Sequence, residues 1–222
     1  KQVQDETADA EAGSTDGWGE TADHELFESF KFKLTATLTA DEEYAEYEKY
    51  KVVFTDTMSA GITFESIESV KVDGVPVTNY SCTATAGQAG GEWTLTIDNI
   101  KIDGVDLTNG AVIEVIYNAH LNSNAVVGNH DDNVNKVKLN FSNNPNAGGE
   151  NDLGSTEEDW VWVFTYNVDV DKVDGKDKTQ MLAGAEFKLK NSAGKWATVE
   201  NGEIKGWVDS QDAGTTLTSD AN

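Results

Sequence analysis

The chain has 222 residues, enough for one large or two ordinary domains, and 38% of them are hydrophobic, which argues against wholesale disorder. Its formal net charge is −24, from 40 acidic residues against 16 basic residues that are all lysine. Nucleic acids and anionic membranes attract clustered positive charge and arginine forks, so both are excluded as favoured partners. The acidity fits solubility in an exposed, extracellular setting.

Segments that would place the chain in a membrane or mark its processing are not evident in the sequence. No apolar run approaches the length needed to span a bilayer, and neither a signal peptide nor an anchoring tail is recognisable. We therefore expect a processed chain or a fragment of a longer one.

Cys82 is the single cysteine of the chain, which excludes an intramolecular disulfide. Small extracellular domains often depend on such a covalent staple. An extracellular form of this chain is therefore expected to be stabilised in another way.

Alternation of apolar and polar residues predicts β-strands with one buried face through most of the first 140 residues. In chain order the alternating runs are residues 30–38, 50–54, 93–97, 113–117 and 137–141. Turn signals separate them, at Asp73-Gly74, Gly90-Gly91, Asp103-Gly104 and Asn109-Gly110. The acidic residues 41–47 predict a short helical turn. Regularly spaced short strands indicate a β-sandwich.

The later part of the chain suggests a second unit. Residues 143–158 are rich in Gly, Asn and acids and predict a loop. A long strand then follows, in which one face carries Trp160, Trp162, Phe164, Tyr166, Val168 and Val170. Trp160 and Trp162 are expected in the core, and the strand is expected to join domain 1–166 stiffly to domain 167–222.

In residues 167–222 we expect strands at 168–172, 186–189, 196–199 and 204–208. The sequence then ends on TLTSDAN, which is turn-like and offers no closing strand. The second domain is therefore predicted to be incomplete in this sequence.

Two stretches of the chain carry a family resemblance. KVVFTDTMSAGITF followed by VIEVIYNAHLNSNAVVGNHDDNVNKVKLNFSNNPN resembles the isopeptide-forming fimbrial domain of Gram-positive sortase-assembled backbone pilins. VDVDKVDGKDKTQMLAGAEFKLKNSAGKW is similar to the start of a collagen-adhesin B-type domain. The resemblance implies an all-β fold of tandem immunoglobulin-like sandwiches, the first like a collagen-adhesin A-type domain and the second B-type-like.

The fimbrial domains of this family join a lysine on the first strand to an asparagine on a late strand, with an acid on an intervening strand as catalyst. Matched by motif, the resemblance implies Lys1 as the donor, Asp56 as the catalytic acid and Asn135 as the acceptor. Lys31 and Lys33 are competing donors, but they alternate with Phe30 and are expected to face away from the aromatic layer. Lys172 corresponds to the donor of the second domain, and its partner lies outside the sequence.

The chemistry explains why these three residue types are needed together. Burial lowers the pKa of a lysine and raises that of an aspartic acid, so the amine becomes nucleophilic and the acid can donate a proton. The acid is expected to hydrogen-bond the asparagine carboxamide as the amine displaces ammonia, in a dry pocket for which Phe54, Phe141 or Trp162 are candidate walls. Such a bond forms once, on the protein itself, so no enzymatic turnover and no cofactor are expected.

The resemblance implies a structural subunit of a cell-surface pilus, extracellular and attached to the cell wall, with other pilin subunits joined to it by a sortase. Two alternatives stay open: a non-polymerised adhesin stalk built of the same modules, and a carbohydrate-binding accessory module that uses Trp18 or Trp93. A host or glycan ligand is possible in either case.

No metal site is predicted. His120 and His130 lie near Asp131 and Asp132 in the sequence, a grouping that could suggest a metal site. We interpret these residues as solvated loop residues instead. The acidic run after residue 168 fails the calcium-loop spacing because Val173 occupies a ligand position.

Overall fold

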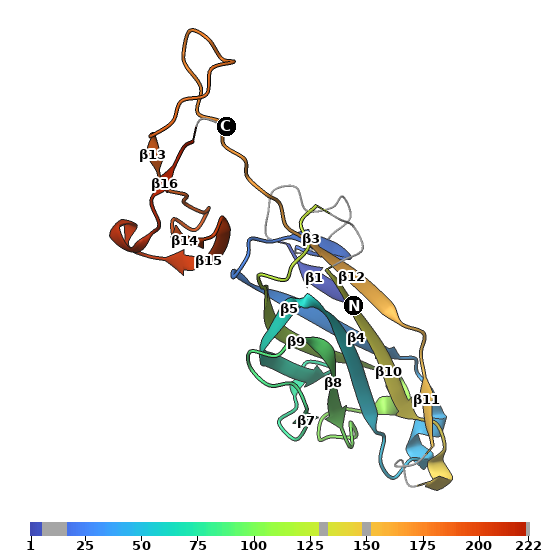
Figure 1. Ribbon diagram of the computed structural model, residues 1–222. Helices are drawn as coiled ribbons and strands as arrows, with labels where there is room; N and C mark the ends of the chain where they lie inside the picture. The colour runs from blue at the N-terminus through green and yellow to red at the C-terminus, as the bar shows by residue number, and fades with distance from the viewer. Residues whose placement is uncertain (6–16, 129–132, 148–151, 221–222) are drawn as a thin grey trace.

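The computed structural model describes residues 1–5, 17–128, 133–147 and 152–220. These residues form an elongated β-structure from residues 2–164 and two small sheets from residues 186–218 (Figure 1). The helical segments in the described part of the chain are short 3₁₀ turns. The all-β, sandwich-like fold class predicted from the sequence is confirmed.

The described residues form the strands β1 (Gln2–Gln4), β2 (Trp18–Gly19), β3 (Thr21–Asp23), β4 (Ser29–Leu38), β5 (Val52–Val72), β6 (Val75–Pro76), β7 (Ser81–Cys82), β8 (Ala89–Ile97), β9 (Ala111–Leu121), β10 (Val134–Ser142), β11 (Leu153–Ser155), β12 (Asp159–Phe164), β13 (Glu186–Phe187), β14 (Trp196–Glu200), β15 (Glu203–Val208) and β16 (Leu217–Thr218).

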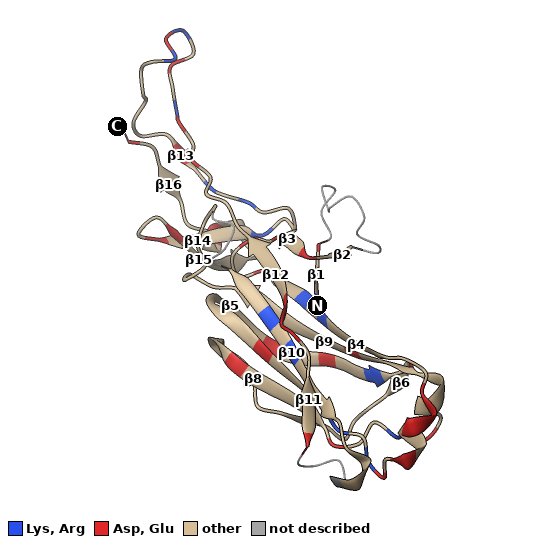
Figure 2. Cartoon of the chain, turned by 90° about the vertical axis from the view of Figure 1, so that its right-hand side faces the viewer, with Lys and Arg blue, Asp and Glu red and all other residues tan. Residues whose placement is uncertain are grey.

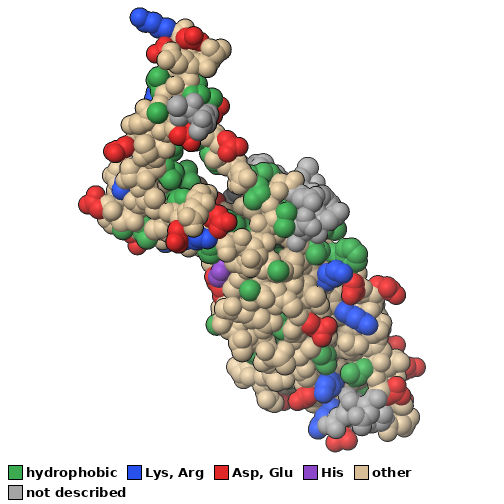
Figure 3. Space-filling view, viewed as in Figure 1, with side chains coloured by type: hydrophobic (Ala, Val, Ile, Leu, Met, Phe, Trp, Pro, Cys, Tyr) green, Lys and Arg blue, Asp and Glu red, His purple; other side chains and the backbone are tan. Residues whose placement is uncertain are grey.

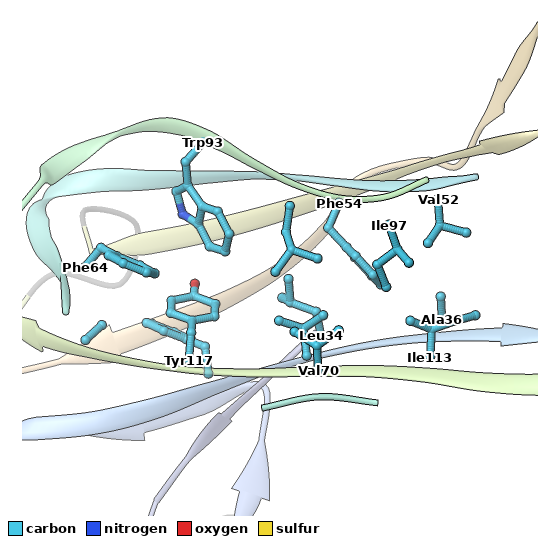
Figure 4. Packing of buried hydrophobic residues seen from close by; sticks show 14 of the residues in the cluster. Leu34, Ala36, Val52, Phe54, Phe64, Val70, Trp93, Ile97, Ile113 and Tyr117 are labelled. Carbon is cyan, nitrogen blue, oxygen red and sulfur yellow. The ribbon is translucent and has the colours of Figure 1, made fainter. Parts of the chain in front are cut away.

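The large sheet has the order β2-β1-β4-β9-β5-β10-β12-β3, and β8 adds to the other side of β5. Most neighbours are antiparallel, whereas β12 pairs with β3 in parallel. The hydrogen-bonded sheet folds over into two layers that face each other across the core (Figures 1 and 4). The first strand of the chain is therefore brought into the same body as β10 and β12.

Strand β5 belongs to both layers. Its first part pairs with β8 and β10, and its second part pairs with β9, with a register shift between Met58 and Thr63. Gly61 lies at this crossing, where an added Cβ would come within 2.6 Å of the Ala125 Cα. The chain can pass between the layers here because glycine leaves room for that backbone.

The core contains the side chains that the alternating sequence pattern predicted. Leu34 and Phe54 contribute from β4 and β5, and Leu95 and Ile113 from β8 and β9, all at most 2% exposed. Figure 4 shows these inward faces meeting between the layers, with Trp93, Phe64 and Tyr117 gathered at one end. The period-two prediction for these strands is confirmed.

The prediction of one strand running from residue 160 to residue 170 is wrong. β12 ends at Phe164, and Tyr166, Val168 and Val170 are 66%, 70% and 60% exposed. Among the described residues, no neighbouring strand pairs with the chain beyond Phe164 up to residue 172, so ladder hydrogen bonds do not extend it.

The predicted inward face of β12 is also wrong. Val161 and Val163 are buried, whereas Trp160 is 43% exposed and lies under Lys136, whose Nζ is 4.7 Å from a ring centroid. Both faces of this strand are apolar, so alternation alone could not choose between them. The smaller valines fit between the layers, and the tryptophans cover the outside.

Two short strands occupy segments that were predicted to lack them. Within the predicted loop, β11 pairs with β10, and near the end of the chain β16 pairs with β13. The predicted strand at 168–172 is not formed, and the remaining predictions in that part correspond to β13, β14 and β15. The predicted acidic helical turn is the 3₁₀ segment Glu42–Glu46, capped by the Asp41 side chain.

Lysine and acidic positions are interspersed along the strands and loops of the chain (Figure 2). A hollow separates the small sheets from the sandwich (Figure 3), and beside it Trp207 Nε1 donates a hydrogen bond of 2.7 Å to the Leu26 carbonyl. No helix in the described part of the chain is long and apolar enough to cross a membrane.

Candidate functional site

The structure brings Lys1, Asp56 and Asn135 together in the interior. Lys1 immediately precedes β1, Asp56 lies on β5 and Asn135 lies on β10. The side chains of Lys1 and Asp56 are fully buried, and Asn135 is 0% exposed. Residues that are distant in the sequence thus share one dry site.

Strand register explains how Asp56 and Asn135 meet. Asp56 pairs with Val137 and Asn135 with Met58, so the two polar residues are offset by two positions. Side chains two positions apart on a strand point to the same face. Asp56 and Asn135 are therefore diagonal neighbours on the inward face.

Lys1 reaches Asp56 because the strand that follows it, β1, is held in the sandwich by its pairing with β4. Lys1 Nζ forms a buried ion pair with Asp56 Oδ2, and it lies 3.3 Å from the Lys136 carbonyl oxygen. The competing lysines face outward: Lys31 pairs with Glu68 at 3.0 Å, and Lys33 Nζ lies 4.4 Å from a ring centroid of Trp18. Lys1 is thus the lysine at the site.

The Tyr117 hydroxyl connects all three residues, a role that the sequence analysis missed. The Asn135 Nδ2 donates to Tyr117 Oη at 2.5 Å, and Tyr117 Oη donates to Asp56 with both carboxylate oxygens at 3.2 Å. Lys1 Nζ lies 3.4 Å from the same hydroxyl. A buried tyrosine hydroxyl requires a polar partner, which is the signal that could have identified Tyr117 on its otherwise apolar strand face.

The expected direct contact between the acid and the amide is not made. Within the described residues, Asp56 and Asn135 share no hydrogen bond, and the Tyr117 hydroxyl stands between them. The predicted hydrogen bond from Asp56 to Asn135 is therefore replaced by two hydrogen bonds that meet at the Tyr117 hydroxyl. The Asp56 and Asn135 side chains are further apart than a directly opposite pair because the two residues are diagonal partners.

Aromatic rings enclose the amine. Lys1 Nζ lies 5.3 Å from the ring centroid of Phe32 and 5.8 Å from that of Tyr117. Trp93, directly opposite Asp56 on β8, meets the Tyr117 ring edge-on at 5.0 Å.

Among the described residues, the candidate walls named from the sequence make no ring contact with the Lys1 amine, which lies over Phe32 and Tyr117 instead. Phe54 is part of the buried core, and Phe141 and Trp162 are only partly buried. Phe54 and Phe141 share the strands of Asp56 and Asn135, and Trp162 lies on the neighbouring β12, whereas Phe32 and Tyr117 come from β4 and β9 in the facing layer.

Burial brings the amine closer to its neutral, nucleophilic form than an exposed lysine would be. Burial lowers the pKa of Lys1 to about 8, although the carboxylate of Asp56 opposes this change. Burial raises the pKa of Asp56, and the nearby amine partly offsets the rise. Burial also holds the pKa of Tyr117 well above its ordinary value, so the phenol keeps its proton.

Within the part of the chain that the structure describes, the buried Asn135 Oδ1 has no hydrogen-bond partner. An unsatisfied buried acceptor costs about 1–3 kcal/mol. The carboxamide oxygen is thus buried without a compensating hydrogen bond, which raises the energy of this group.

The other predicted positions are not brought to this site. Lys172 is exposed, so its role as a donor stays a prediction. His120 pairs with Glu65 at 2.7 Å, and His130, Asp131 and Asp132 lie outside the described residues. The described part of the chain contains no group of three or more His, Cys, Asp or Glu able to hold a metal ion.

Solved pilin structures share this fold. The 35 kDa C-terminal fragment of the major pilin GBS80 of Streptococcus agalactiae is 21% identical, with a TM-score of 0.60, covering 79% of this chain and 61% of that one. BcpA, the major pilin subunit of Bacillus cereus, is 22% identical, with a TM-score of 0.56, covering 90% and 52%.

The group B streptococcus pilus 2b backbone protein is 23% identical, with a TM-score of 0.56, covering 91% of this chain and 74% of that one. The chain thus spans about three fifths of the length of the GBS80 fragment and about half of the length of BcpA. No curated protein sequence matches the chain.

A family model described as Gram-positive pilin backbone subunit 2, Cna-B-like domain, matches residues 28–145. The match covers more than half of the chain and includes Asp56, Tyr117 and Asn135. The chain therefore belongs to the Gram-positive pilin backbone family.

Proposed function

We propose that this chain is a structural module of a surface pilus, braced by an isopeptide bond that forms spontaneously between Lys1 Nζ and Asn135 Cγ. Asp56 is the acid–base catalyst of this bond. The observation that carries the proposal is the buried contact of Lys1 with Asp56, connected to the Asn135 amide through one hydroxyl. A fully buried lysine that served only stability would be costly, because its charge is removed from water.

The reaction balances without a cofactor. The Lys1 ammonium and the Asp56 carboxylate exchange a proton, and the neutral amine attacks Asn135 Cγ. The Cγ–Nδ2 bond breaks and the nitrogen leaves as ammonia. Of the two protons that Nζ loses overall, one completes the ammonia and the other remains on Asp56, which ends as a neutral acid in its buried position.

Proximity lowers the activation barrier for this chemistry. Folding holds the amine, acid and amide in one place, and such positioning can replace about 7–11 kcal/mol of an uncatalysed barrier. The Lys1 side chain is 0% exposed, with the rings of Phe32 and Tyr117 beside its amine, so solvent does not stabilise the amine as a cation. The protein changes itself once and does not act on a separate substrate.

Family membership supports assembly at the cell surface. We infer an extracellular subunit that is joined to other pilin subunits by a sortase and attached to the cell wall. Membership of the pilin backbone family and the elongated sandwich support this proposal. A division into modules 1–166 and 167–222 accompanies it, with Lys172 as the donor of a second bond.

The test is the intact mass of the purified chain. We expect the mass to be lower than the sequence mass by one ammonia, and fragmentation to locate a crosslink between the peptides that contain Lys1 and Asn135. Asn135→Ala, Asp56→Ala and Lys1→Ala should each restore the full mass.

Matched controls use residues of the same type outside the site. Asn140→Ala, also on β10, and Lys33→Ala, on β4, should keep the deficit of one ammonia. A parent chain at full sequence mass, or an Asn135→Ala variant that is still one ammonia light, contradicts the proposed bond.

A carbohydrate-binding role gains no support from the two tryptophans that suggested it. Trp93 is 1% exposed and packs on Tyr117, so it cannot act as a stacking platform for a sugar. Trp18 is covered by the Lys33 ammonium.

A further inference from the structure

Tyr117 occupies the position between the acid and the leaving group. Its hydroxyl accepts from Asn135 Nδ2 at 2.5 Å and from Lys1 Nζ at 3.4 Å, and it donates toward Asp56 at 3.2 Å. Both lone pairs of the oxygen are therefore engaged, and its single proton is directed to the carboxyl group. This is a defined donor–acceptor order rather than a general polar contact.

We propose that Tyr117 is a catalytic residue for isopeptide formation, whose hydroxyl relays the proton of Asp56 to the Asn135 nitrogen as ammonia leaves. This inference rests on the proposed Lys1–Asn135 bond. It adds a fourth reacting residue to the donor Lys1, the acid Asp56 and the acceptor Asn135.

The relay follows from the missing direct contact. In the described structure, the acid and the amide nitrogen make no hydrogen bond to each other, yet the nitrogen must gain a proton to depart as ammonia. The shortest connection between them passes through Tyr117 Oη. General acid catalysis requires a donor within hydrogen-bond reach of the atom that it protonates, and the Tyr117 hydroxyl meets that condition.

Packing holds the hydroxyl in place. The Tyr117 ring contacts Phe32, Phe64 and Trp93, with ring centroids 5.2, 5.8 and 5.0 Å away. Figure 4 shows the phenol projecting from β9 across the core toward the layer that carries Trp93. Burial keeps the phenol protonated, so it can pass on a proton at neutral pH.

The proton balance is closed within these four side chains. After the Lys1 ammonium transfers a proton to Asp56, the amine attacks Asn135 Cγ. Once the amine has added, Nδ2 carries a basic lone pair and the two hydrogen bonds of Tyr117 reverse their direction. Tyr117 then gives its hydroxyl proton to Nδ2 and receives the proton of Asp56, while Asp56 takes the proton that Nζ still has to lose. The Cγ–Nδ2 bond breaks, ammonia departs, and Tyr117 and Asp56 are both left neutral.

The experiment uses Tyr117→Phe in the full chain, which keeps the ring and removes only the hydroxyl. Protein made in a short burst of cell-free translation is sampled over time, and the fraction that is one ammonia lighter is read by intact mass. We expect the rate of bond formation to fall by about 100-fold or more, the effect typical of a lost general acid. A parental rate in Tyr117→Phe overturns the relay.

Tyr50→Phe is the matched control. Tyr50 is 3% exposed and belongs to a separate aromatic group with Tyr44 and Tyr47. Its variant should form the bond at the parental rate. If the parent itself shows no ammonia loss, the proposed bond fails; if the parent reacts and Tyr117→Phe reacts equally fast, only the relay fails.

A second variant covers the case in which Tyr117→Phe does not fold. Site-specific replacement of Tyr117 by 3-fluorotyrosine retains the ring and the hydroxyl but makes the phenol a stronger acid. Because the phenol protonates the leaving nitrogen, the rate near neutral pH should increase several-fold. A rate equal to or below the parental rate overturns the proposal.

Discussion

A buried amine and a buried acid that share a proton determine how the site responds to pH. The pKa of Lys1 is lowered to about 8 by burial, and that of Asp56 is raised by the same cause, while Asp159 on β12 adds a smaller attraction for the ammonium. Below the pKa of Lys1 the pair retains one proton between its members. That proton is the one the leaving group needs.

The rate of ammonia loss should therefore stay level from about pH 7 to the pKa of Lys1 and fall roughly tenfold per unit above it. Above this pKa the amine is free, but Asp56 is a bare carboxylate and cannot supply a proton. Mass measurements over time at several pH values check this. A rate that continues to rise with pH would mean that amine deprotonation alone limits the reaction.

The three proposed reacting residues could be named from the sequence, but their connection could not. Asp56 and Asn135 stand in motifs of a recognisable family, and Lys1 follows from strand order. Tyr117 was identified only as a core residue of its strand, because alternation shows that a side chain is buried and not what its polar tip contacts. Which groups the Tyr117 hydroxyl contacts depends on how the two layers pack against each other, and local sequence patterns do not contain that information.

At the scale of the elements, β5 is the strand on which the architecture depends. Its first part carries Asp56 and its second part pairs with β9, which carries Tyr117. The crossing at Gly61 therefore fixes how the acid and the hydroxyl are placed relative to each other.

We expect Gly61→Ala to lower the free energy of unfolding by about 1–3 kcal/mol, as overpacking does. The new Cβ would lie 2.6 Å from the Ala125 Cα and 2.7 Å from Asn133 Oδ1, so the backbone must shift. Chemical denaturation measures the change. Gly175→Ala, where no atom lies within 4 Å, is the control and should be close to neutral; equal stability of Gly61→Ala and the parent would contradict the steric argument.

Strand prediction succeeded where one face is apolar and the other polar, as in β4, β8 and β9. It failed where both faces are apolar, as in β12, whose valines rather than tryptophans point inward. It also missed the edge strands β11 and β16, which have two or three residues and form because a partner strand is already in place. Such pairing is a tertiary effect that local patterns do not contain.

For the whole molecule, the proposed bond closes a loop that contains most of the sandwich. By analogy with a disulfide closing a loop of this length, the bond is worth roughly 5 kcal/mol. Asn135→Ala should then lower the midpoint of thermal unfolding by about 10–20 °C. Calorimetry measures this against Asn140→Ala, and similar midpoints for the two variants would show that the bond adds no stability.

The proposed bond should also limit how far the chain can be stretched. Pulled between handles at Lys1 and beyond Thr165, the parent can release only the segment after Asn135, because residues 2–134 are bypassed by the bond. Asn135→Ala should release those residues as well. Single-molecule force spectroscopy compares the two extensions, and equal extensions would exclude the bypass.

The placement of the site's residues on the first strand, β5, β9 and β10 has a consequence for biogenesis. Under the proposed chemistry, the bond can close only after the layers have assembled, since no partly folded chain brings all four side chains together. Each molecule of ammonia released then records one completed folding event. The step also makes folding partly irreversible, because a chain with the isopeptide bond cannot return to the fully unfolded ensemble.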